Sequence, residues 1–67
     1  MSANGKIGTV EERVGLFWRV RYGPGLNEIV YLHPSRFYDR YPVEGDQYLL
    51  EYAESSNGME YYAKRLT

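Results

Sequence analysis

The sequence contains no cysteine and a single histidine among its 67 residues. Without cysteine, neither a disulfide nor a thiolate metal site can stabilise the fold. The only adjacent carboxylates are Glu11 and Glu12, which point to opposite faces of a regular strand. No spacing of the histidine with other polar residues suggests a metal site or a nucleophile–base pair. We therefore expect no enzymatic activity, no metal and no cofactor.

Long apolar runs are also missing from the chain. No stretch approaches the length needed to cross a bilayer, and the first five residues lack the apolar segment of a signal peptide. There is no internal repeat, low-complexity segment or linker. We expect residues 1–67 to form one cytoplasmic domain without membrane contact, near the lower size limit for unassisted folding.

An excess of positive charge is absent as well, since the formal net charge is −1. This argues against strong, general binding to nucleic acid. The charges are unevenly distributed, because residues 1–43 hold six of the eight basic residues but only four of the nine acidic ones. Six of the eight basic residues are arginine, which stacks on rings and bonds phosphate with two donors. Such asymmetry also arises by chance in a short chain.

Aromatic residues are abundant, with eight Tyr, two Phe and one Trp. Alternation over residues 46–53 predicts that Tyr48, Leu50 and Tyr52 share a core-facing side. A core this small cannot enclose all eight tyrosines, so several are expected at the surface. Exposed aromatic residues at this density are typical of a contact surface for nucleic acid or for a protein partner.

Alternating and β-branched segments bounded by turn residues predict five short strands, and no window has sustained helical periodicity. Pro34 favours one helical turn after the third strand, over residues 34–38. A flat sheet of this size would leave its edges exposed, so we expect a small barrel of the OB-fold or SH3-like type. The predicted strands span residues 6–13, 16–22, 28–33, 46–53 and 59–66.

The first two predicted strands differ in regularity. Ile7 and Val10 lie three residues apart, so they can share a face only if Gly8 forms a bulge; Gly8 otherwise marks a close approach of backbone. In the second strand the alternation is regular and places two sets of residues on opposite faces. One set is Leu16, Trp18, Val20 and Tyr22; the other is Phe17, Arg19 and Arg21.

The third predicted strand ends in a polar and aromatic turn. Val30 and Leu32 suit the core, whereas Tyr31 and His33 point to the other face. Two neighbouring rings that can stack and donate hydrogen bonds are typical of a base-binding surface. The alternative interpretation is a half-buried strand with an amphipathic outer face.

Three segments in order resemble the cold-shock domain family, whose members are small OB-fold modules that bind single-stranded RNA and DNA. Residues 5–7 resemble the family's Gly-Lys-Val start. Residues 30–37 resemble its second RNA-binding motif, Val-Phe-Val-His-Phe-Ser-x-Ile, with Tyr31 and His33 in the ring positions. Residues 43–52 resemble its fourth strand, and residues 62–66 loosely match its closing strand. The resemblance implies an all-β, five-stranded OB-fold barrel.

The chain departs from the family in its first RNA-binding motif, Lys-Gly-Phe-Gly-Phe-Ile, which is replaced by residues 15–20. If Val20 takes the core position, Phe17 keeps one ring and Arg19 stands where the second would be. If the register shifts by one residue, Trp18 and Leu16 are the exposed pair instead. Thr9 or its neighbour also replaces a first-strand Trp, and Pro34 replaces a stacking Phe.

The resemblance and the strand pattern together predict a binding module for single-stranded RNA or DNA on the second and third strands. Stacking of two or three bases with two or three charge contacts predicts affinity that is micromolar at best and strongly salt-dependent. The acidic residues 44–60 would repel nucleic acid, so binding is expected on the opposite face. Trp18 could instead belong to the core. The candidate binding residues are Lys6, Phe17, Trp18, Arg19, Arg21, Tyr31 and His33.

A second function fits the same fold. A small regulator or inhibitor could keep the barrel but bind a protein partner, as the near-neutral charge and the altered first motif favour. The choice between RNA and DNA and the oligomeric state are left open by the sequence.

Overall fold

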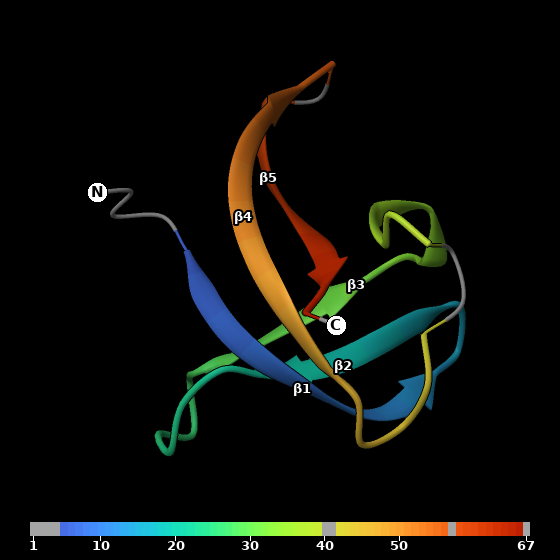
Figure 1. Cartoon of the computed structure of the whole chain (residues 1–67), viewed down its shortest axis with the longest axis vertical. Helices are drawn as coiled ribbons and strands as arrows, with labels where there is room; N and C mark the ends of the chain where they lie inside the picture. Colours follow the sequence, from blue (N-terminus) through green and yellow to red (C-terminus); the bar gives the residue numbers. More distant parts are fainter. Residues whose placement is uncertain (1–4, 40–41, 57, 67) are drawn as a thin grey trace.

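The computed structural model of the chain describes residues 5–39, 42–56 and 58–66. They form an all-β structure of five strands and one short 3₁₀ turn (Figure 1). All five predicted strands are confirmed, with ends within two residues of those expected. No helix in the described ranges is long and apolar enough to cross a membrane. The elements are β1 (Lys6–Val14), β2 (Phe17–Arg21), β3 (Ile29–Leu32), η1 (Pro34–Arg36), β4 (Gln47–Ser55) and β5 (Gly58–Arg65).

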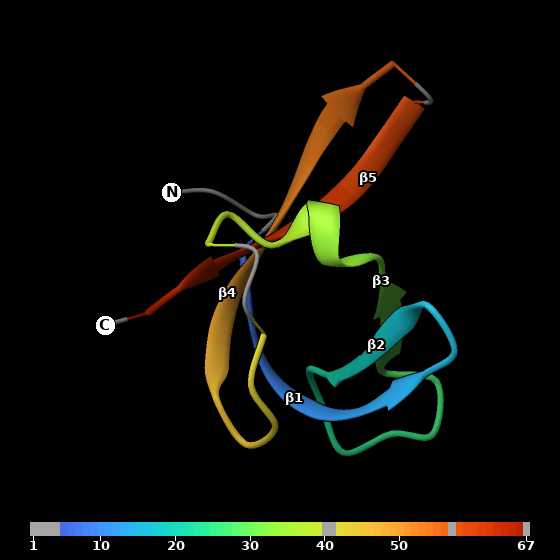
Figure 2. The ribbon, with the colours of Figure 1, turned by 90° about the vertical axis from the view of Figure 1, so that its right-hand side faces the viewer.

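The five strands form one curled antiparallel sheet in the order β3-β2-β1-β4-β5. The first three strands are a meander, and β4 returns to pair with β1, so that β4-β1-β2-β3 has the spatial order of a Greek key. Figure 2 shows that β1 bends around the interior and that the far end of the β4–β5 hairpin projects away from it. The result is a half-barrel.

We predicted a closed barrel, but within the described residues no strand ladder joins β3 to β5. β3 and β5 lie at opposite ends of the strand order. They are linked through a parallel bridge between Phe37 and Ala63, and the Tyr38 N–H donates to the Ala63 carbonyl at 2.9 Å. β3 ends just before Pro34, which has no backbone N–H with which to continue a ladder. The 3₁₀ turn is shorter than predicted because Phe37 is already extended.

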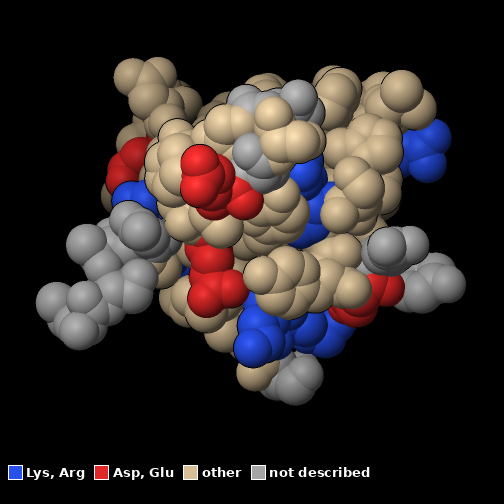
Figure 3. Space-filling view, turned by 90° about the horizontal axis from the view of Figure 1, so that it is seen from above, with Lys and Arg blue, Asp and Glu red and all other residues tan. Residues whose placement is uncertain are grey.

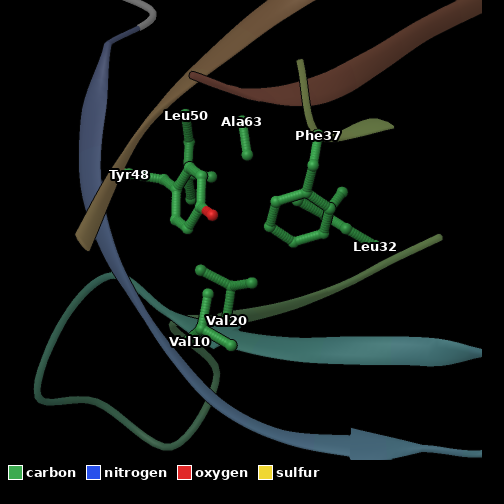
Figure 4. Close-up of a cluster of buried hydrophobic side chains, with 7 residues drawn as sticks. All are labelled: Val10, Val20, Leu32, Phe37, Tyr48, Leu50 and Ala63. Atoms are coloured by element: carbon green, nitrogen blue, oxygen red, sulfur yellow. The ribbon is translucent and has the colours of Figure 1, made fainter. Parts of the chain in front are cut away.

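The core lies inside the curve of the sheet, where alternate residues of several strands meet (Figure 4). The rings of Phe37 and Tyr48 pack edge to face, with centroids 5.1 Å apart. The predicted burial of Tyr48 and Leu50 is confirmed, but Tyr52 is 40% exposed. Tyr52 lies on the same side of β4 as these two residues, but nearer the β4–β5 turn, where the hairpin projects beyond the core. The buried residues are Val10, Val20, Leu32, Phe37, Tyr48, Leu50 and Ala63.

Gly8 is a point of close approach, as one of the two sequence interpretations proposed. A Cβ atom at this position would lie 2.6 Å from Val20 Cγ1 and 2.9 Å from Leu50 Cδ1. The bulge itself is elsewhere: the β1–β2 register shifts between Val10 and Glu12. Ile7 and Val10 therefore need not share a face, and Ile7 is exposed while Val10 is buried.

An arginine-centred network reinforces the side of the half-barrel where β5 ends. Arg65 Nε donates to Asp39 Oδ2 at 2.6 Å, Nη2 donates to the Tyr48 hydroxyl at 2.6 Å, and Nη1 bonds Asp46. Asp39 follows η1 and Asp46 precedes β4, so one side chain ties together three segments that are distant in sequence. Burial raises the pKa of the Tyr48 hydroxyl, and the Asp39 carboxylate adds to this effect.

Candidate nucleic-acid interface

The outer face of β2 and β3 carries most of the predicted binding residues. Residues paired across an antiparallel ladder lie on the same side of the sheet. Arg19 pairs with Tyr31, while Val20, which is fully buried, pairs with Val30. This settles the register of the second strand: Val20 takes the core position, and Phe17 and Arg19 lie on the outer face.

Aromatic rings occupy one end of this outer face. Phe17 is 45% exposed and Tyr31 is 49% exposed, and His33 is also exposed. The rings of Phe17 and His33 pack edge to face, with centroids 5.9 Å apart and planes at 75°. No pocket is formed by the described part of the chain. The rings therefore form an open surface against which flat ligands could stack.

Local hydrogen bonds fix the orientation of the His33 ring. The Ser35 N–H donates to His33 Nδ1 at 3.2 Å, and the Ser35 hydroxyl lies 2.9 Å from the same nitrogen. An amide N–H can only donate, so Nδ1 is the acceptor and the neutral ring carries its proton on Nε2. His33 is thus the N-cap of η1, with Pro34 at the first position. The sequence His-Pro-Ser presents an oriented N–H donor beside Phe17.

Two arginines occupy the rest of the face, and both are held by Glu11. Arg19 Nε donates to Glu11 Oε1 at 2.8 Å, and Arg21 Nε donates to Glu11 Oε2 at 2.6 Å. Arg19 Nη2 also lies 3.1 Å from Glu12 Oε2. Our expectation that Glu11 and Glu12 point to opposite faces is wrong. The bulge in β1 adds one residue opposite β2 and brings both carboxylates to the arginine side.

These ion pairs determine the electrostatics of the face. Hydrogen bonds from Arg21 and Arg19 lower the pKa of Glu11, so its carboxylate is charged at neutral pH. The hydrogen bond to Glu11 also raises the pKa of Arg19. Two positive charges are therefore offset by two negative ones within the same patch. Figure 3 shows the molecule from above, where basic and acidic side chains lie among other residues.

Two of the predicted binding residues lie on the inner side of the sheet. Trp18 pairs with buried Leu32 and packs against the core. Lys6 pairs with buried Leu50, and its ammonium group lies 5.1 Å from the centre of the Tyr22 ring. The structure thus brings together Phe17, Arg19, Arg21, Tyr31 and His33 on one face and separates Trp18 and Lys6 from them.

Comparison with models of known protein families, with curated proteins and with solved structures found no match. The chemistry of the face must therefore be inferred from its geometry. The described residues contain no group of three His, Asp or Glu side chains arranged to hold a metal ion. The available groups are aromatic ring faces, one oriented imidazole N–H and two guanidinium planes, which suit stacking and hydrogen bonding.

Sequence reasoning missed Glu11 as part of this face. Its position depends on the bulge, and no glycine marks the bulged residue. A usable signal was the charge pattern itself: the acidic pair in the first strand faces Arg-x-Arg across a short hairpin. Opposite charges facing each other across an antiparallel pair stabilise the sheet.

A second group of rings lies on the projecting hairpin and beside it. The Tyr52 and Tyr61 ring centroids are 4.7 Å apart, and Tyr22 lies 6.3 Å from Tyr61. Met59 belongs to the same side of β5 and is 48% exposed. These four residues, called here the hairpin patch, are on the inner side of the sheet, away from the outer face of β2 and β3.

Proposed function

We propose that the chain is an OB-fold module that binds single-stranded nucleic acid on the outer face of β2 and β3. The fold assignment is supported by the Greek-key strand order, by β5 lying beside β4, and by the parallel bridge through Phe37. An OB-fold is a partly open, five-stranded Greek-key barrel, and the face of its second and third strands is its usual site for oligonucleotides.

The observation that carries the proposal is the cluster of Phe17, Tyr31 and His33 on that face. Their rings are exposed, are held by a strand register and by the Ser35 hydrogen bond, and have no other described ring covering them. In a single strand the bases are accessible for stacking, and each base–aromatic stack contributes about 1–3 kcal/mol. The Nε2–H of His33 can donate to an acceptor on a base edge.

Fluorescence anisotropy of labelled oligo-dT and oligo-U at low salt tests this function. Saturable binding is expected, with Tyr31→Ala weakening it by about 1–3 kcal/mol. His33→Ala should weaken it as well. Comparing the two oligonucleotides also determines whether the module prefers DNA or RNA.

Tyr52→Ala is the matched control, because it removes the same side chain from the hairpin patch. Its affinity should equal that of the wild type. An affinity unaffected by Tyr31→Ala, or absent at high micromolar protein, would contradict the proposal.

A second candidate function is binding of a protein partner through the hairpin patch. The observation that favours it is the exposure of Tyr52 and Met59 beside Tyr61, on a hairpin with acidic neighbours such as Glu54. Exposed aromatic and Met side chains are enriched where proteins meet. If Tyr52→Ala disrupts function in cells while Tyr31→Ala does not, the protein-binding function is the correct one.

A further inference from the structure

The bridge from Glu11 to both arginines limits what the outer face can bind. Each oxygen of the carboxylate takes the Nε–H of a different arginine, at 2.8 and 2.6 Å. Arg19 is additionally bound to Glu12 through Nη2. Arg21 Nη1 points toward the Gly25 carbonyl at 3.4 Å. The two guanidinium groups are therefore fixed against the sheet, and their charge is already compensated.

A phosphate group that approached these arginines would meet the Glu11 carboxylate in the same place. Binding the phosphate through both Nε atoms would require Glu11 to move away, which breaks two charge-assisted hydrogen bonds. If Glu11 stayed, its negative charge would lie against the phosphate. Neither case offers a net gain in binding free energy, so the arginines contribute little to phosphate binding. The guanidinium planes themselves stay available beside Tyr31 for contact with a flat ring.

We propose that Glu11 is the specificity-determining residue of this face: it makes the face select accessible base rings and reject phosphate presented alone. This inference rests on the proposed function and deepens it. A duplex offers phosphates on its surface but keeps its base faces stacked inside. The wild-type face should therefore bind single strands with weak salt dependence and bind duplex DNA of the same length poorly.

The test compares the wild type with Glu11→Gln, which keeps the size of the side chain and removes its charge. Each additional phosphate contact steepens the slope of log K against log salt by about 0.7 for a single strand. Glu11→Gln frees one or both arginines, so the slope should steepen by about 0.7–1.4. Between about 50 and 200 mM salt, the variant should lose about 3–7-fold more affinity than the wild type. It should also gain duplex binding at low salt.

Glu54→Gln is the matched control, since it makes the same change in net charge at an exposed position on the β4–β5 hairpin. Its salt slope should equal that of the wild type, which separates a local effect from one of total charge. Glu12→Gln should give a smaller change than Glu11→Gln, because Glu12 contacts only the outer nitrogen of Arg19. Circular dichroism of each variant confirms that the fold is retained.

Three outcomes decide the inference. A steeper slope and new duplex binding in Glu11→Gln, but not in Glu54→Gln, support it. Equal slopes for Glu11→Gln and the wild type, with single-strand binding still dependent on Tyr31, overturn it while leaving the proposed function intact. Absence of single-strand binding in both proteins overturns the proposed function and this inference with it.

Discussion

Two arginine–carboxylate networks of similar chemistry have different positions in this molecule. The Arg65 network joins Asp39, Asp46 and the buried Tyr48 ring, and so connects segments far apart in the chain. The Glu11 network joins two neighbouring strands that five residue pairs already hold together on either side of the bulge. The first network lies where the half-barrel closes, and the second lies on an open face.

The difference indicates separate roles for the two networks. The ion pair from Arg65 to Asp39 adds to the stability of the closed form, because Asp39 follows η1 and lies outside the β4–β5 ladder that already pairs Tyr48 with Arg65. The ion pairs of Glu11 add little stability, because the backbone ladder holds β1 and β2 together without them. Their main effect is on the charge that a ligand encounters. The Arg65 network should therefore control stability, and the Glu11 network should control binding.

The largest expected effect follows from removing the ring at the centre of the Arg65 network. Tyr48→Ala deletes a fully buried side chain that packs on Phe37, and large-to-small aromatic changes in cores cost about 3–5 kcal/mol. Urea unfolding measures this loss. Tyr48→Phe keeps the ring and removes only the hydroxyl, so it should cost about 1–3 kcal/mol and remains measurable if the alanine variant does not fold.

Arg65→Gln tests the network through its arginine. It removes the charge shared by Asp39 and Asp46 and one partner of the Tyr48 hydroxyl. We expect a clear decrease in the midpoint of urea unfolding, with oligo-dT affinity unchanged once the protein is folded. A variant as stable as the wild type would show that closure does not depend on this network.

The two networks should also respond at opposite ends of the pH range. The pKa of Tyr48 is raised above 10.0 in the folded chain, chiefly by burial, so the unfolded chain loses this proton first and stability falls as the pH rises above about 10. The pKa of Glu11 is lowered below 4.5, chiefly by the Arg21 hydrogen bond. The contribution of the Glu11 carboxylate to the free energy of unfolding is present above its pKa in the unfolded chain. It is lost as the pH falls through its pKa in the folded chain.

Both pH dependences can be checked by measuring urea unfolding at several pH values for the wild type and for a variant of each group. Tyr48→Phe should reduce the alkaline loss of stability, and Glu11→Gln should reduce the acid loss. Identical pH profiles for the wild type and both variants would show that Tyr48 does not cause the alkaline loss of stability and that Glu11 does not cause the acid loss.

The smallest expected effect is that of Glu11→Gln on stability at neutral pH. Its ion pairs lie on a partly exposed surface between strands that are paired already. The midpoint of urea unfolding should stay close to that of the wild type, well above that of Arg65→Gln. A loss of stability as large as that of Arg65→Gln would contradict the assignment of stability to one network and of binding to the other.

Much of the strand arrangement could be predicted because local patterns determine it. Regular alternation in residues 16–22 predicted the two sets of β2 residues, and the burial of Val20 in the structure shows which set faces the core. The polar turn at Pro34 correctly ended β3. The Asn-Gly pair at residues 57 and 58 is a strong signal for a hairpin turn. Asn57 lies outside the described residues, and Gly58 has a φ of +100° that favours glycine.

The parts that sequence reasoning did not predict depend on non-local geometry. The bulge at Glu11 arises from the pairing of β1 with β2, and it decides which side two carboxylates occupy. The exposure of Tyr52 depends on how far the hairpin extends beyond the enclosed core. The placement of Lys6 over Tyr22, which follows β2, depends on the antiparallel pairing of β1 with β2.

The most direct test of the proposed binding face is a heteronuclear NMR titration of the isotope-labelled chain with short oligo-dT. Binding on the outer face of β2 and β3 predicts saturable shifts of the backbone amides of Phe17–Arg21 and Ile29–Leu32 and of those of Glu11 and His33. The amides of the β4–β5 hairpin should change little. Shifts confined to the hairpin, or no shifts at high micromolar protein, would contradict the proposed face.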